Sequence, residues 1–360
     1  MDIILLAIAL AVILLGAELF TNGIEWFGRK LDLAEGAVGS VLAAVGTALP
    51  ETMIPIVAIL LPTGAETTDA AHGVGVGAIL GAPFMLATLA MFVTGTAVVL
   101  QARRRPTGDD MLVNPTVLGK DIRYFFIAYG LAIASAFLPT DADLLRIAAA
   151  GLLLVIYAVY VRAHFVATHE AEAESEGLAP LRFHRLDRPG RVADPLTPRL
   201  RVVNLQVVGA LGLILVGAVV FVEAVQHLST SLGVPPIILA LVIAPIATEL
   251  PEKFNSIIWV RRGKDTLAMG NITGAMVFQS CIPTIVALLF AADAWSVDLS
   301  SAESLITFAS AGIAFVSTGA IFLPMIRRGR LTGRSLMVGG AFYAAYLVLI
   351  GLLLSGVLPQ

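Results

Sequence analysis

Long stretches of apolar residues recur along this chain and alternate with short polar segments. Each stretch has about twenty residues or more, which is enough for a helix to cross a bilayer. All of them should be helical, because lipid offers no hydrogen-bond partners to open backbone groups. The pattern predicts an all-α membrane protein with ten transmembrane helices, at about residues 2–27, 36–61, 71–100, 121–138, 143–163, 202–229, 235–260, 266–291, 302–326 and 335–357.

The basic residues indicate how these helices are oriented. Of the 23 lysines and arginines, 21 lie in or beside the loops that follow the odd-numbered helices, and the exceptions are Arg146 and Lys253. Loops rich in lysine and arginine stay in the cytoplasm. We therefore expect a multi-pass protein of the cell membrane with both termini on the extracytoplasmic side.

Composition agrees with a membrane protein and narrows its chemistry. Hydrophobic residues make up 58% of the 360 positions and charged residues 14%, whereas soluble domains have about 25% charged residues. The single cysteine, Cys281, excludes a disulfide within one chain and a cysteine-based metal cluster. Topology explains the basic loops, so the bilayer is an expected partner and nucleic acid is not. The sequence leaves the oligomeric state open.

A polar segment at 164–200, rich in glutamate, arginine and proline, divides the chain into residues 1–163 and 201–360. It predicts a cytoplasmic linker between two halves. Each half has five predicted helices. Because five is odd, the second half enters the membrane from the opposite side, which is the arrangement of an inverted repeat.

Short identities support this repeat. A shift of 201 positions places Leu49–Glu51 on Leu250–Glu252, and a shift of 193 places Gly77–Ala82 on Gly270–Ala275. Related halves of this kind are typical of secondary transporters, in which a central site is exposed to each side of the membrane in turn.

Glu51 and Glu252 are the strongest candidates for that central site. Each follows a proline near the middle of a predicted helix, and proline frees backbone carbonyls that could bind a cation. A carboxylate inside a membrane is costly and usually functional. Two carboxylates at equivalent places, together with carbonyls and hydroxyls, favour a hard cation such as Ca²⁺.

Neighbouring polar residues extend the candidate site. Thr47 and Thr248 precede the glutamates by four residues, so their hydroxyls either bind the same ion or hydrogen-bond back to their own helix. Asn255 follows Glu252 by three residues and shares its helix face.

These motifs resemble those of the cation/Ca²⁺ exchanger superfamily, which includes the sodium/calcium exchangers. That family carries two copies of a motif near G-T-S-L-P-E and two of a motif near G-N-I-x-G-S-N-x-F. The first is similar to Gly46–Glu51 and Ala247–Glu252, and the second to Gly77–Met85 and Gly270–Phe278.

The resemblance covers nearly the whole chain and implies exchange of Ca²⁺ for Na⁺ or H⁺, without a cofactor. It also implies that Glu51, Glu252, Thr47 and Thr248 supply side-chain ligands and that Ala43 and Ala244 supply backbone carbonyls.

The chain departs from the family pattern at several oxygen donors. Ala48 and Glu249 replace the serines of the first motif, while Pro83 and Met276 replace polar residues of the second. Glu249 and Lys253 stand four residues apart, in the favourable order for an ion pair. Either this pair is an intramembrane salt bridge, or the lysine acts as a built-in cation that changes the number of ions exchanged.

Three functions remain in competition. The first is a secondary cation antiporter, and the second is a divergent family member that moves or binds another cation. The third is a membrane enzyme that uses the two glutamates as an acid and a base. Such an enzyme needs clustered His, Arg or Asp side chains, which the predicted helices lack. We therefore expect a transporter and not an enzyme.

Overall fold

The computed structural model describes residues 2–30, 43–61, 68–168, 179–186 and 198–355, and within them it leaves undescribed the side chains of 43–50 and 250–255, among others. Nearly all of the described chain is helical. In chain order the elements are α1 (Asp2–Lys30), α3 (Ala43–Leu60), α4 (Thr68–Met85), the π-helix η2 (Leu86–Ala90), α5 (Met91–Gln101), β1 (Asp110–Met111), α6 (Pro115–Ser135), α7 (Asp143–Thr168), the 3-10 helix η3 (Arg182–Leu186), α8 (Leu200–Leu232), α9 (Pro236–Arg261), α10 (Asp265–Phe290), α11 (Ala302–Arg328), β2 (Leu331–Thr332) and α12 (Gly333–Leu354).

Seven helices of the described chain are long and apolar enough to cross a membrane, and they include the continuous helix Thr68–Gln101. They match seven of the ten predicted transmembrane helices. The other three predictions fall on α3, α6 and α9, which carry more polar residues or are only partly described. The total of ten, and the division at 164–200, therefore stay predictions.

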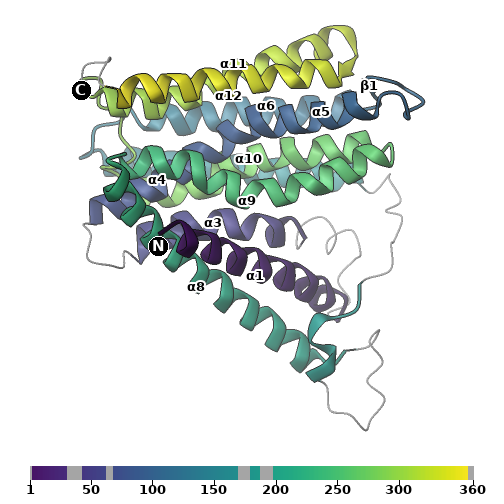
Figure 1. The fold of residues 1–360 in the computed structure, drawn as a ribbon, viewed down its shortest axis with the longest axis horizontal. Coiled ribbons are helices and arrows are strands. Elements are labelled where there is room, and N and C mark those ends of the chain that lie inside the picture. The colour runs from purple at the N-terminus through teal and green to yellow at the C-terminus, as the bar shows by residue number, and fades with distance from the viewer. Residues whose placement is uncertain (1, 31–42, 62–67, 169–178, 187–197, 356–360) are drawn as a thin grey trace.

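The helices form three layers (Figure 1). One layer contains α5, α6, α11 and α12, the middle layer contains α4, α9 and α10, and the third contains α1, α3 and α8. In the most apolar 18-residue stretch of the helix Thr68–Gln101, 83% of the residues are buried, whereas in that of α7 only 22% are. Helices α4 and α5 are therefore central and α7 is peripheral. Large apolar side chains on the outer helices, such as Leu144 and Val208, are exposed and fit contact with lipid.

A close pair of helices forms one edge of the molecule. Helices α1 and α8 cross at Gly16 and Gly217, and a methyl group on either glycine would lie 2.7 Å from an isoleucine of the partner helix. Gly16 meets Ile214, and Gly217 meets Ile13. Because a shift of 201 positions converts each contact into the other, this crossing has a local twofold relation.

Helices α4 and α9 approach more closely still. A methyl group on Gly77 would overlap the carbonyl oxygen of Ile237, and one on Gly81 would overlap that of Leu241. Small residues allow backbones in membranes to pack at such short range. This crossing positions one wall of the candidate site.

Polar contacts join the connecting segments at the end of the molecule opposite the two termini (Figure 1). Strand β1 pairs with β2, which brings the segment after α5 beside the start of α12. Arg105, which is nearly buried, forms an ion pair with Asp265 at 2.5 Å and donates to the carbonyl of Val260 at 2.8 Å. The loop after α5 is thereby fixed to the junction of α9 and α10.

The segment 179–186, called the linker segment below, packs against α1 and α8. Leu181 is fully buried beside Trp26, whose indole N–H donates to the carbonyl of Ala179 at 2.8 Å. Asn22 of α1 accepts from the Arg182 backbone N–H at 3.0 Å and from the Gln206 side chain of α8 at 2.9 Å. This part of the predicted linker is therefore bound to the helix pair.

Candidate functional site

Glu51 lies in the interior of the protein on α3. Its side chain is 7% exposed, and the Gln279 amide on α10 donates to Glu51 Oε2 at 2.5 Å. Hydrogen bonds to a charged acceptor are stronger than those between neutral groups. The contact holds one carboxylate oxygen in place and joins α3 to α10.

A small cavity adjoins this carboxylate. Its volume is about 10 Å³, which is enough for about one water molecule or one dehydrated ion. Helices α3, α4 and α9 line it with Glu51, Ile54, Ala78, Ala82, Ala244, Pro245 and Thr248. Three of the predicted site residues, Glu51, Thr248 and Ala244, therefore meet at one place.

Thr248 contributes a hydroxyl to this cavity. Its side chain is 3% exposed, and its hydroxyl donates to the carbonyl of Ala244 at 3.0 Å. The proton is thus used within the helix, as one of the two sequence interpretations expects, while the oxygen lone pairs stay free to bind a cation. Both interpretations of Thr248 are compatible with this geometry.

Glu249 is completely buried on α9, and it is not among the residues that line the cavity. The side chains of the other predicted site residues, Glu252, Asn255, Thr47 and Ala43, lie outside the described residues, as does Lys253. The proposed pairing of the lysine with Glu249 therefore stays a prediction. In the part of the chain that is described, no three His, Cys, Asp or Glu side chains meet in a metal-binding group.

The sequence interpretation did not select Gln279 as a site residue. It placed the substituted polar positions of the second motif at Pro83 and Met276, both of which are buried in this structure. Gln279 lies three residues beyond Met276 on the same helix. A shift of 193 positions aligns Gln279 with Leu86, so this polar residue corresponds to an apolar residue in the other half of the sequence.

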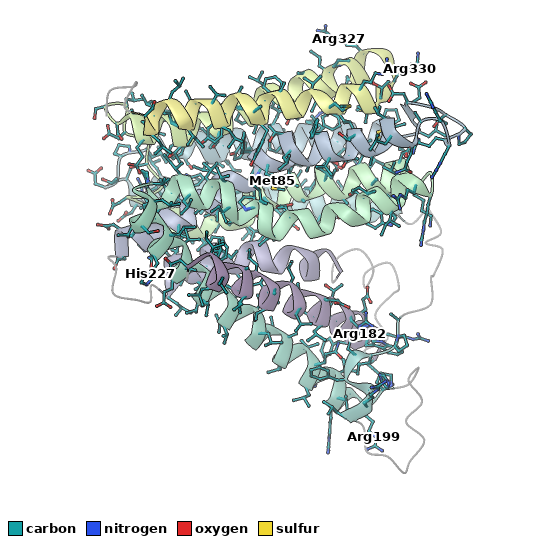
Figure 2. The ribbon with its side chains drawn as sticks, viewed as in Figure 1. Met85, Arg182, Arg199, His227, Arg327 and Arg330 are labelled. Carbon is teal, nitrogen blue, oxygen red and sulfur yellow. The ribbon has the colours of Figure 1, made fainter. Side chains whose placement is uncertain are left out.

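Pro83 lies inside α4, next to Ala82 of the cavity wall. It has no backbone N–H to donate, and the helix continues after Met85 as the π-helix η2. π-Helical turns inside α-helices are frequent at functional sites. Figure 2 shows Met85 near the middle of the molecule, away from both of its ends.

The chain matches the profile of the sodium/calcium exchanger protein family over residues 1–166 and 204–354. The chain belongs to this family. The two matched stretches lie on either side of the polar segment and cover most of both halves.

Individual relatives of this exchanger are distant. An Alkalimonas amylolytica protein named "Putative antiporter CaxA" is 24% identical over 340 residues, which is 91% of each chain. The crystal structure of the H⁺/Ca²⁺ exchanger CAX has a TM-score of 0.66 and 16% identity, and the match covers 98% of this chain and 87% of that one.

A structure of the sodium-calcium exchanger NCX_Mj has a TM-score of 0.55 at 16% identity, covering 96% of this chain and 97% of that one. At such identities the structural likeness shows the fold alone. The matched family is one of transporters, in agreement with the expectation of a multi-pass membrane protein and not an enzyme.

Proposed function

We propose that this exchanger is a secondary antiporter that carries Ca²⁺ in one direction and Na⁺ or H⁺ in the other. The observation that carries the proposal is the buried Glu51 carboxylate, held by Gln279 beside a cavity that Thr248 and Ala244 also line. These are all oxygen ligands, which Ca²⁺ and Na⁺ prefer. Glu252 would supply the second carboxylate from the equivalent position of the other half.

Alternating exposure of this site would follow from an inverted repeat of five helices in each half. The twofold contact of Gly16 and Gly217 supports that repeat, because the two glycines occupy equivalent positions of the two halves. Exchange of conformation between the halves would then expose the cavity to each side of the membrane in turn.

The positions of the basic residues support the predicted orientation. Figure 2 shows Arg182, Arg199, Arg327 and Arg330 toward one end of the molecule and His227 at the other. The helix starting at Asp2 begins at the His227 end, and the helix ending at Leu354 finishes there (Figure 1). By the preference of arginine for the cytoplasmic side, both termini would be extracytoplasmic.

A second candidate is a divergent exchanger that moves or binds another cation. Three observations favour keeping it: Ala48, Pro83 and Met276 each lack the oxygen donor expected at their position. Fewer oxygen ligands weaken binding of a divalent cation, which needs six to eight oxygens, more than they weaken binding of a monovalent one.

Flux of radioactive Ca²⁺ into proteoliposomes tests the proposal. We expect uptake driven by an imposed Na⁺ or H⁺ gradient, and loss of uptake in Glu51→Gln and in Glu252→Gln. Glu18→Gln is the matched control, because Glu18 is 60% exposed and forms a surface ion pair with Arg182. Uptake that survives both site variants would overturn the site, and no Ca²⁺ uptake under either gradient would favour another cation.

A further inference from the structure

A second buried carboxylate lies apart from the cation cavity. Asp121 on α6 is 1% exposed. The Tyr160 hydroxyl on α7 donates to its Oδ1 at 3.1 Å, and the Thr273 hydroxyl on α10 donates to its Oδ2 at 2.6 Å. Three helices therefore converge on this one acidic group, and none of its three residues lines the cavity beside Glu51.

The cluster has the hydrogen-bond geometry to hold Asp121 in either protonation state. Thr273 Oγ1 lies within reach of two acceptors, Asp121 Oδ2 at 2.6 Å and the Met269 carbonyl at 3.1 Å. When the carboxylate takes up a proton, its new O–H can donate to Thr273 Oγ1, and the threonine proton turns to Met269. Tyr160 continues to donate to the other oxygen. A hydroxyl, with one proton and two lone pairs, permits this reversal without movement of a helix.

Groups of α6, α7 and α10 surround Asp121. Tyr160 lies within electrostatic range of two further titratable groups, Tyr157 of α7 and Cys281 of α10. On α6 itself, Lys120 precedes Asp121 and donates to the Ala163 carbonyl at 3.1 Å. Aromatic rings lie nearby: Tyr124 contacts the Tyr160 ring, and Phe315 of α11 packs on Phe125, four residues beyond Asp121.

The other half of the chain repeats this cluster without its carboxylate. A shift of 186 positions places Tyr157 and Tyr160 on Tyr343 and Tyr346, and Asp121 on Thr307. Tyr346 donates to the carbonyl of Ile306 at 3.1 Å, and Thr307 donates to that of Glu303 at 2.8 Å. In this half the tyrosine and threonine hydroxyls therefore donate to neutral backbone carbonyls. A buried tyrosine at this place in the fold does not require an acidic partner. This contrast points to a role for Asp121 beyond structure.

We propose that Asp121, Tyr160 and Thr273 form a proton-binding site that is separate from the cation cavity. Helix α10 connects the two, since it carries Thr273 and, about 9 Å farther along its axis, the Gln279 amide that holds Glu51. Proton binding at Asp121 would thus act on a helix that contacts the transport site. The link to transport rests on the proposed function, whereas proton binding itself does not.

Infrared difference spectroscopy of the full-length protein in bilayers tests the proposal directly. A change from about pH 8 to about pH 4, across the range in which carboxyl groups titrate, is made without Ca²⁺, and the C=O stretching band of a protonated carboxyl group is recorded. We expect one such band to be lost in Asp121→Asn and retained in Glu51→Gln. An unchanged set of bands in Asp121→Asn would overturn the proposal.

A second pair of variants applies if Asp121→Asn does not fold. Tyr160→Phe removes one donor to the carboxyl group and should move the pH midpoint of the band. Tyr346→Phe makes the same change in the other half and should leave the midpoint where it is. Equal midpoints in the two variants would overturn the proposal. Absence of Ca²⁺ flux with the band intact would instead refute the proposed exchange function.

Discussion

Replacement of Gly81 by alanine tests how closely α4 and α9 must approach for the cavity to form. The added methyl carbon would overlap the Leu241 carbonyl oxygen and lie 2.8 Å from Pro245 Cγ. Carbon atoms in normal contact are about 3.5–4 Å apart, so the two helices must separate by about 1 Å. Overpacking of this kind costs about 1–3 kcal/mol. Because Ala82 and Pro245 line the cavity, the same displacement moves its walls apart.

Two measurements follow from this displacement. Thermal unfolding can be recorded with a thiol-reactive dye, because Cys281 is the only cysteine and is buried in the folded protein. We expect the Gly81→Ala variant to unfold several degrees below the wild type. Ion ligands must keep their distances within about 0.2 Å, so the stabilisation by Ca²⁺ should require at least about tenfold more of the ion.

Gly130→Ala is the matched control for this experiment. It adds the same methyl group to α6 at a position where the structure describes no atom within 4 Å. Its unfolding temperature and Ca²⁺ response should equal those of the wild type. If both alanine variants behave alike, the close approach of α4 and α9 does not shape the site, and the reasoning fails.

Three further predictions concern contacts elsewhere in the fold. Gln279→Leu removes a hydrogen bond to the Glu51 carboxylate worth about 1.5–3 kcal/mol, so Ca²⁺ flux should fall at least about tenfold, and undiminished flux would contradict the site. Arg105→Met takes the ion-pair partner from buried Asp265 and should destabilise the protein by about 3–5 kcal/mol, as measured by thermal unfolding. Trp26→Phe removes the indole donor to the linker segment and should speed its cleavage by trypsin, while cleavage at the wild-type rate would show that this bond does not hold the segment.

Much of the helical framework could be predicted from local sequence signals. Long apolar runs mark the helices, and turn chemistry marks several of their ends. Asn114 accepts backbone N–H groups at the start of α6 and is followed by proline at the first helical position. Gly233 and Gly329 have positive φ angles directly after α8 and α11, where other residues would be strained.

The candidate site was predictable only where it repeats. The duplicated Leu-Pro-Glu sequence identified Glu51, and the threonine four residues before each glutamate identified Thr248. Gln279 has no polar counterpart at Leu86, and Asp121 has none that titrates at Thr307, so neither gave a repeated signal. Their importance depends on which helices lie side by side, and contacts between distant segments are not encoded in local periodicity.

The two halves of the chain are interleaved rather than adjacent. The most extensive helix contacts join α1 to α8, α4 to α9, α5 to α12 and α6 to α10, and each pair takes one member from each half. Neither half, produced alone, would cover the main apolar faces of its own helices. The molecule is therefore held together mainly by contacts between the two stretches of chain rather than within each of them. A chain of this kind completes its core only after its second half has been synthesised, and until then the first half depends on lipid or on a chaperone to shield those faces.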